Sequence, residues 1–199
     1  MLAARSIGAA NTLVFRDGRI LGSNSDAFGF LENLRQEQPG WRADAGPAVV
    51  LGAGGAARAI VWALIDQGAP KVRVVNRTLS RAETLAEDLG GPVRPRDWSQ
   101  LSGALGDAAL LVNSTSLGMR GQPALDVALA SLPGEALVTD IVYAPLETEL
   151  LRAARARGNP VVDGLGMLLH QARPGFDAWF GVAPEVTPEL RAVVLGDGK

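Results

Sequence analysis

Cysteine is absent from this sequence of 199 residues, and histidine occurs once, as His170. The lack of cysteine excludes disulfides, thiol catalysis and cysteine-ligated metals, and a single histidine leaves too few ligands for a structural zinc site, so we expect no metal. Lysine is also rare, because only Lys71 and Lys199 occur. No apolar run approaches the roughly 18 residues of a membrane span, and no signal-peptide pattern opens the chain.

The net charge of −2 argues against the basic surface typical of proteins that bind nucleic acid or anionic membranes. We therefore expect a cytoplasmic protein that acts on a small molecule, with no nucleic acid and no membrane among its partners. The hydrophobic fraction of 47% and the charged fraction of 20% are ordinary for a globular protein. A chain of this length can bury a substantial core in one large domain or two small ones.

From residue 48 onward, short apolar runs alternate with helical patterns. This alternation predicts an α/β fold with a Rossmann-like, doubly wound parallel sheet, and continuously apolar strands fit a sheet covered on both faces. The expected strands are 48–52, 71–77, a short piece near Val93, 106–114, 136–143 and 160–164, and the expected helices are 55–68, 80–90, 148–158, 166–181 and 187–196.

The first part of the sequence has a different pattern. A short helical run (2–7) precedes two apolar runs, 12–15 and 19–22, which flank an Asp-Gly pair and so predict a β-hairpin. The strand at 12–15 has no preceding strand to pair with, so we expect that the sequence opens partway through a larger fold. A helix is expected after the hairpin, with Asp26 placed to cap its first turn.

A glycine-rich turn carries the clearest chemical signal. The stretch Gly52, Ala53, Gly54, Gly55, Ala56 and Ala57 matches the pattern G-x-G-x-x-[G/A] between a predicted strand and a predicted helix. Gly52 permits the tight turn, Gly54 lets a pyrophosphate approach the backbone, and Ala57 lets the helix pack on the sheet. The helix start then faces the anion. Glycines also cluster in turns for steric reasons alone, but the strand–turn–helix context favours dinucleotide binding.

The end of the second predicted strand indicates which dinucleotide binds. NAD-binding proteins carry a carboxylate there for the ribose 2′-hydroxyl, whereas this sequence has Asn76, followed by Arg77, Thr78 and Arg81. An arginine at this position can bind a 2′-phosphate through paired donors and stack on adenine. The alternative is that both arginines are solvated surface residues. The placement favours NADP as the cofactor.

Several stretches together resemble one family, the shikimate dehydrogenases. They occur in the family's order and cover nearly the whole chain: IGAANTLV (7–14), GSNSDAFGF (22–30), VVLGAGGAARAI (49–60), VVNRTLSRAETLA (74–86), LVNSTSLGM (111–119), VTDIVYAPLETELL (138–151) and GLGMLLHQARPGFDAWFG (164–181). The resemblance implies reversible, NADPH-dependent reduction of 3-dehydroshikimate to shikimate, a step of aromatic amino-acid biosynthesis. It also implies a substrate cleft between a substrate domain and the dinucleotide domain.

The resemblance also implies roles for single residues. Asn11 resembles the asparagine that binds a substrate hydroxyl, and Asp26 the acidic half of a catalytic Lys–Asp pair. Ser25 stands where the family usually has threonine. The remaining matches are Tyr143 in the cleft and Gln171 against the substrate. On the cofactor side they are Ser114 and Thr115 along the ribose, Gly164 and Met167 near the nicotinamide, and Ile141 as a further cofactor-binding residue.

Other interpretations of these residues stay open. Asp26 could be only a helix cap, Asn11 a turn residue and Gln171 a surface residue. His170 could act as a general base. Its place beside the better-matched Gln171 favours a packing or surface residue instead.

The sequence departs from the family in one respect. It contains neither the serine pair for the substrate carboxylate nor the NVTxPHK-like stretch with the catalytic lysine, and Lys71 would enter the sheet on the wrong side. We therefore expect a truncated shikimate dehydrogenase with little or no activity alone. The alternatives are an NADP-binding module or pseudoenzyme, and an enzyme completed by another polypeptide.

The resemblance further predicts a domain division and an exposed surface. Residues 1–25 would be the remnant of the substrate domain, 26–163 the NADP-binding domain, and 164–199 helices that return to the substrate domain. Apolar surface around residues 7–22 and 165–182 would then be exposed, which favours self-association.

Overall fold

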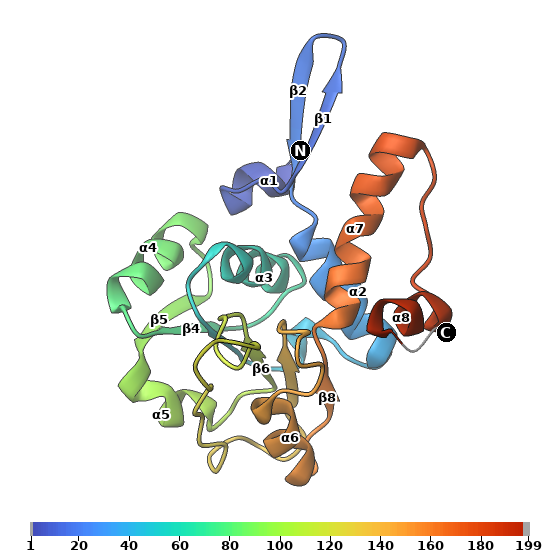
Figure 1. Cartoon of the computed structure of the whole chain (residues 1–199). Helices are drawn as coiled ribbons and strands as arrows, with labels where there is room; N and C mark the ends of the chain where they lie inside the picture. Colours follow the sequence, from blue (N-terminus) through green and yellow to red (C-terminus); the bar gives the residue numbers. More distant parts are fainter. Residues whose placement is uncertain (1, 197–199) are drawn as a thin grey trace.

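A six-stranded parallel sheet forms the centre of the structure (Figure 1). The computed structural model describes residues 2–196. The strand order is β5-β4-β3-β6-β7-β8, so the chain reverses its direction of winding between β3 and β6. This order confirms the predicted doubly wound sheet. The strands are β3 (Ala48–Leu51), β4 (Val72–Asn76), β5 (Val93–Asp97), β6 (Leu110–Asn113), β7 (Leu137–Asp140) and β8 (Val161–Val162).

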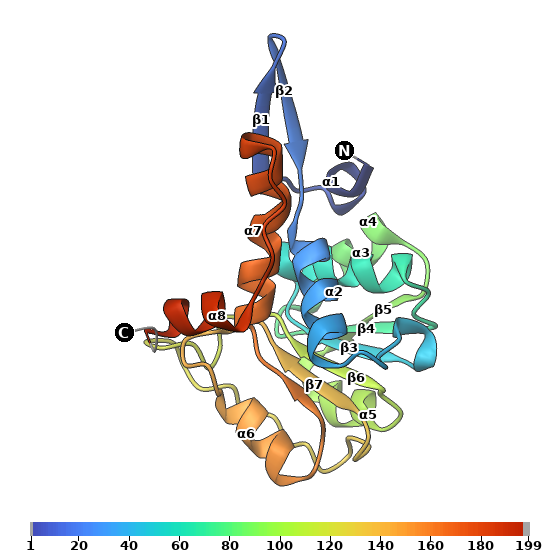
Figure 2. The same cartoon turned by 90° about the vertical axis from the view of Figure 1, so that its right-hand side faces the viewer.

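Helices cover both faces of this sheet (Figure 2). Successive strand residues point to opposite faces, so Val50 packs in one core and Val49 in the other. The first core includes buried residues of α2 (Asp26–Glu37), α3 (Gly55–Asp66) and α4 (Leu79–Leu89). The second core includes α5 (Leu101–Leu105) and α6 (Glu149–Ala156).

A β-hairpin projects away from the main sheet (Figure 1). It follows α1 (Leu2–Ile7) and consists of β1 (Thr12–Arg16) and β2 (Arg19–Ser23). Asp17 and Gly18 both have positive φ angles, of 51° and 69°, as the predicted Asp-Gly hairpin turn requires. The hairpin lies beside the far end of α7 (Leu165–Phe180), where the Trp179 indole donates a hydrogen bond to the Leu13 carbonyl at 3.1 Å. The last helix is α8 (Pro188–Leu195).

Two helices cross unusually closely because each contributes a glycine. A Cβ added at Gly29 of α2 would stand 2.7 Å from Gln171 Cβ and 2.8 Å from the Met167 carbonyl oxygen of α7. A Cβ at Gly166 of α7 would stand 1.8 Å from Asn33 Oδ1. The two backbones can therefore approach only while these positions lack side chains. This crossing fixes α7 relative to the middle of α2.

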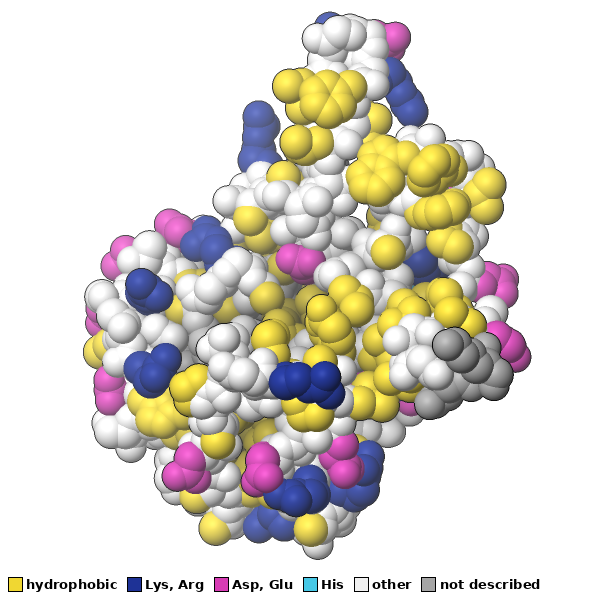
Figure 3. Space-filling model, in the orientation of Figure 1, with side chains coloured by type: hydrophobic (Ala, Val, Ile, Leu, Met, Phe, Trp, Pro, Cys, Tyr) yellow, Lys and Arg dark blue, Asp and Glu magenta, His cyan; other side chains and the backbone are white. Residues whose placement is uncertain are grey.

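Apolar side chains remain exposed at one end of the molecule (Figure 3). The expected exposure is only partly correct, because Ile7, Leu165 and Met167 are buried in the core. We call the exposed set the apolar end; it comprises Leu13, Phe15, Ile20, Phe176, Trp179, Phe180 and Val182. Within residues 2–196, every helix is too short or too polar to span a bilayer.

Candidate functional site

A cavity of about 320 Å³ lies at the carboxyl ends of β6 and β7, against α2 and α7. It brings together Asp26, Ala56, Ser114, Thr115, Ile141, Tyr143, Gly164, Met167 and Gln171, all of them predicted site residues from separate stretches of sequence. Ser116, Met119, Val142 and Leu168 also line it; sequence reasoning missed these, and their only signal is that they lie in the same family-like stretches as predicted residues. Crevices at the carboxyl ends of the strands are where doubly wound folds bind ligands.

The glycine turn forms the entrance to α3. Gly52 has a φ of +103°, and a Cβ there would stand 2.9 Å from Thr115 Cγ2. Both the backbone conformation and the contact with Thr115 therefore require glycine at this position. A Cβ at Gly54 or Gly55 would meet nothing within 4 Å, which leaves open room in front of the helix. The first amides of a helix have no acceptor within it, so they can donate to an anion. Ala57 is fully buried in the core beneath. These features fit a dinucleotide pyrophosphate.

The adjacent strand end carries unpaired positive charge. Asn76 ends β4, and its Nδ2 donates to the Thr78 carbonyl at 2.8 Å, so it shapes the following turn. Arg77 and Arg81 are exposed, and neither forms an ion pair among residues 2–196. Because parallel strands end at the same edge, both arginines lie on the side of the sheet where the glycine turn opens. They fit a phosphate group on the adenine ribose.

Asp26 lines the cavity and is hydrogen-bonded to Asn11, which does not line it. Asn11 Nδ2 donates to Asp26 Oδ1 at 2.8 Å, and Asn11 Oδ1 accepts from the Ser25 amide at 3.0 Å and its hydroxyl at 3.2 Å. Asp26 is the first residue of α2, so the N-cap position belongs to Ser25, not to Asp26. Burial raises the pKa of the Asp26 carboxyl, and the hydrogen bond from Asn11 lowers it in part. Asn11, Ser25 and Asp26 therefore form one bonded cluster.

The polar side chains on the other walls differ in whether they can donate a hydrogen bond to a ligand. Tyr143 is 44% exposed, and Gln171 is half-buried on α7. In contrast, the Ser114 hydroxyl donates to the Leu51 carbonyl at 2.6 Å, and the Thr115 hydroxyl donates to Asn113 Oδ1 at 2.7 Å. The two hydroxyl protons are thus committed to the protein, so Ser114 and Thr115 shape the wall without offering a free donor.

His170 packs between two helices and does not line the cavity. It is buried on α7, and its Nε2 lies 2.7 Å from Gln36 Oε1 of α2. Its pKa is lowered, mainly by burial and further by the nearby Arg173 guanidinium. These contacts agree with the packing interpretation and give no support to a general base.

Neither lysine of the sequence is found near Asp26 in the described part of the chain. Lys71 directly precedes β4, at the amino edge of the sheet, where its carbonyl accepts from the Ala48 amide at 2.9 Å. At this edge the pKa of the Asp107 carboxyl is lowered, mainly by the hydrogen bond from Arg73. The positive charge of Lys71 lowers it by a smaller amount. Lys199 lies outside the described residues.

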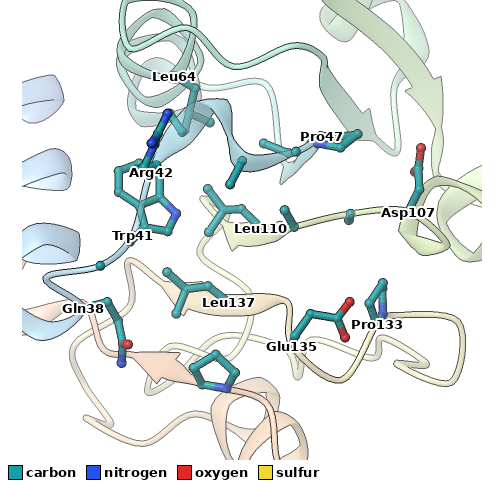
Figure 4. A pocket seen from close by; sticks show the side chains of 18 of the residues that line it. Gln38, Trp41, Arg42, Pro47, Leu64, Asp107, Leu110, Pro133, Glu135 and Leu137 are labelled. Atoms are coloured by element: carbon teal, nitrogen blue, oxygen red, sulfur yellow. The ribbon is translucent and has the colours of Figure 1, made fainter.

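A larger cavity, of about 690 Å³, lies at the opposite edge of the sheet (Figure 4). Trp41, Leu110 and Leu137 are among its lining residues, and it contains none of the predicted site residues. Two of its charged groups are already paired, Asp107 with Arg73 and Arg42 with Asp44. Volume alone therefore does not identify the site. The smaller cavity combines the polar residues with Ala56 of the glycine-rich turn.

Comparisons with known proteins agree with this assignment. The sequence profile of the family "Shikimate / quinate 5-dehydrogenase" matches residues 36–120. A shikimate dehydrogenase (NADP(+)) of Paramagnetospirillum magneticum is 61% identical over 193 residues, which are 96% of this chain and 70% of that protein.

Two solved structures are similar over most of the chain. Shikimate 5-dehydrogenase of Thermus thermophilus, in complex with NADP(H) and shikimate, has a TM-score of 0.80 and 42% identity over 93% of this chain and 67% of that one. Quinate dehydrogenase of Corynebacterium glutamicum, in complex with NAD, has a TM-score of 0.89 and 33% identity over 97% of this chain and 70% of that one. With this fold, this arrangement of site residues and this degree of identity, the chain belongs to the shikimate dehydrogenase family.

Proposed function

We propose that the cavity at the carboxyl edge is the cofactor and substrate site of an NADP-dependent shikimate dehydrogenase, which reduces 3-dehydroshikimate reversibly to shikimate. One observation carries the proposal: Asp26, which is hydrogen-bonded to Asn11, lines one cavity together with Tyr143, Gln171 and the loops after β6 and β7. The relative from Paramagnetospirillum magneticum supports the substrate and the cofactor.

The cofactor is held by groups on three parts of the sheet edge in this proposal. The turn 52–57 donates backbone amides to the pyrophosphate, and Arg77 and Arg81 bind the 2′-phosphate, with Asn76 and Thr78 shaping their turn. Ile141, Gly164 and Met167 surround the nicotinamide end of the cavity. When bound, NADPH supplies the hydride.

The substrate side consists of the remaining polar groups. Asn11 and Gln171 donate to substrate hydroxyl or carbonyl oxygens, while Ser25 is buried and holds Asn11 by its hydroxyl. Carbonyl reduction needs a proton at the oxygen, and a positioned acid typically contributes a factor of about 10²–10⁴ in rate. Asp26 lies at the cavity, and burial raises the pKa of its carboxyl, so it is our candidate for the acidic partner in that proton transfer.

Among the described residues, no lysine lies beside Asp26 to donate the proton. The family resemblance assigns this role to a lysine beside the aspartate, and within residues 2–196 the single lysine is on the far edge of the sheet. We therefore propose that the chain alone binds NADP but turns substrate over slowly or not at all. The same observation favours a second candidate, an NADP-binding module without turnover. In either case residues 26–163 would form the cofactor-binding domain.

The test is the absorbance of NADPH formed from NADP and shikimate at mildly alkaline pH, with quinate measured in parallel. The chain alone should give a rate far below the roughly 10 per second of ordinary enzymes. Adding a separate polypeptide with the NVTxPHK-like stretch should then raise the shikimate rate. No increase would favour the binding module, and a faster rate with quinate would contradict the proposed substrate.

A further inference from the structure

Asn113 and Asp140 form a buried polar pair behind the cavity. They are the last residues of the neighbouring strands β6 and β7 and stand opposite each other in the ladder. Both are 0% exposed, and Asn113 Nδ2 donates to Asp140 Oδ1 at 2.9 Å. Neither side chain lines the cavity, but the residues that follow them in the chain, 114–116 and 141–143, do. The pair therefore sits at the base of both loops.

The Asp140 carboxylate holds both ends of the loop after β7. Its Oδ1 also accepts from the Val142 amide at 3.0 Å, and its Oδ2 accepts from the Thr148 hydroxyl at 2.8 Å. Thr148 is the N-cap residue of α6, so the far end of the loop is tied to a helix. Tyr143 lies between the two tied points. Its position at the cavity mouth therefore depends on the carboxylate.

The Asn113 amide closes the loop after β6 in the same way. Its Oδ1 accepts from the Thr115 amide at 3.0 Å and from the Thr115 hydroxyl at 2.7 Å, and its Nδ2 also donates to the Leu117 carbonyl at 3.2 Å. Every polar atom of the two side chains thus has a partner. Fully satisfied buried networks make the surrounding backbone rigid.

The loop after β7 also supports the start of α7. A Cβ at Gly164 would stand 2.4 Å from the Ile141 carbonyl carbon and oxygen, and 2.7 Å from the Val142 oxygen. The first turn of α7 therefore rests directly on the loop backbone. A displacement of this loop would carry Met167 with it and alter the opposite wall of the cavity.

We propose that Asp140 and Asn113 are positioning residues that set the width of the nicotinamide end of the cofactor site. The inference rests on the proposed function, because it assumes that this cavity receives the nicotinamide. Removing the carboxylate would leave the Val142 amide, the Thr148 hydroxyl and one Asn113 proton without acceptors, and buried donors without partners are costly. The two loops would then separate. The adenine end, held by the glycine turn and Arg77, has no hydrogen bond to this pair and should be unaffected.

The experiment compares two ligands by calorimetric titration: NADPH, and 2′-phosphoadenosine 5′-diphosphoribose, which lacks the nicotinamide. For Asp140→Ala we expect NADPH binding to weaken about tenfold or more while binding of the truncated ligand changes less than about twofold. Asp140→Asn should recover most of the loss, because its amide oxygen can accept from Asn113 and Val142 and its nitrogen can donate to the Thr148 oxygen.

Two further variants keep the test decisive. Val138→Ala removes a buried side chain of the same strand that packs in the α5–α6 core, so it should lower stability without changing the ratio of the two affinities. Thr148→Val removes one donor to Asp140 and should shift the ratio of the two affinities in the direction expected for Asp140→Ala. It therefore provides the test if Asp140→Ala does not fold. Equal losses of both ligands, or the same shift in Val138→Ala, would overturn the positioning role. Failure of the unsubstituted chain to bind either ligand would instead contradict the proposed function.

Discussion

Asp26 illustrates how a candidate site residue can reduce the stability of the fold that carries it. Because burial raises the pKa of its carboxyl, the folded state binds the proton more tightly than the unfolded state does. Stability from the protonated group is present below the ordinary pKa of 3.8 and is lost as pH rises through the higher folded-state value. At neutral pH the ionised carboxylate is therefore a net cost, which is common at functional sites.

Asp26→Asn should accordingly be more stable than the unsubstituted chain at pH 7, and the difference should shrink as pH falls toward 4. The new amide can still accept from Asn11 Nδ2, so the change tests the charge. Urea denaturation at both pH values measures the difference, with Glu83→Gln on the exposed surface of α4 as the control. A gain that is equal at both pH values would contradict the assignment of a raised pKa.

Arg77 tests the choice of cofactor at the level of one side chain. Arg77→Ala should cost roughly 1.5–3 kcal/mol of NADP binding, the range for a hydrogen bond to a charged group, and should hardly change NAD binding. Titration of each cofactor against the variant measures both effects. Arg152→Ala on α6 is the matched control, because α6 lies on the other face of the sheet. Equal losses with NADP and NAD would mean that Arg77 does not contact the 2′-phosphate.

The sequence predicts which residues gather at the site better than it predicts what their side chains do. Asp26, Tyr143 and Gln171 do meet at one cavity, as their motifs indicate. The hydroxyls of Ser114 and Thr115, however, donate to groups of the protein. Such bonds depend on side-chain rotamers and on partners distant in sequence, which a linear motif does not specify.

Secondary-structure elements are most predictable where local chemistry and tertiary packing agree. Apolar runs of parallel strands and the Asp17–Gly18 turn carry their own signals, so β3, β4 and the hairpin match expectation. The sequence does not predict α5, a helix of only five residues that contains Gly103. Nor does it predict the α2–α7 crossing, because a glycine within a helix lowers helix propensity and only the neighbouring helix explains its presence.

Gly29→Ala tests that crossing. Alanine has the higher helix propensity, by about 1 kcal/mol, but its Cβ would overlap Gln171 and the Met167 carbonyl. We expect the cost of this steric overlap to exceed the gain in helix propensity, with a net loss of roughly 1–3 kcal/mol in the free energy of unfolding. Gly103→Ala in α5 has open space for its Cβ and should be neutral or stabilising. Denaturant titration of both variants measures this, and a stabilised Gly29→Ala would contradict close contact between the helices.

At the scale of the whole molecule, the apolar end is the least usual feature. Phe15 is 74% exposed and Phe180 66% exposed, and side chains of this kind gather on the hairpin and the end of α7 (Figure 3). Large exposed apolar patches are rare in monomers and favour association. No residue of the apolar end lines the cavity at the carboxyl edge, so association and cofactor binding should be separable.

The chain should therefore self-associate at micromolar concentration and bind a hydrophobic dye. Phe15→Ser combined with Phe180→Ser should reduce both effects and leave NADP binding unchanged, because neither side chain lines the cavity. Sedimentation velocity and dye fluorescence measure the two effects. Phe28→Ser, a partly exposed phenylalanine of α2 outside the apolar end, is the control. A monomer without dye binding would contradict this prediction.

The central claim is that this chain carries a preformed NADP site at the carboxyl edge of its parallel sheet. Calorimetric titration of NADP and NAD against the unsubstituted chain tests it most directly, because the result depends on the glycine turn and the two arginines and not on turnover. We predict saturable binding of one NADP per chain and much weaker binding of NAD. Equal affinity for the two cofactors, or no binding of either, would contradict the claim.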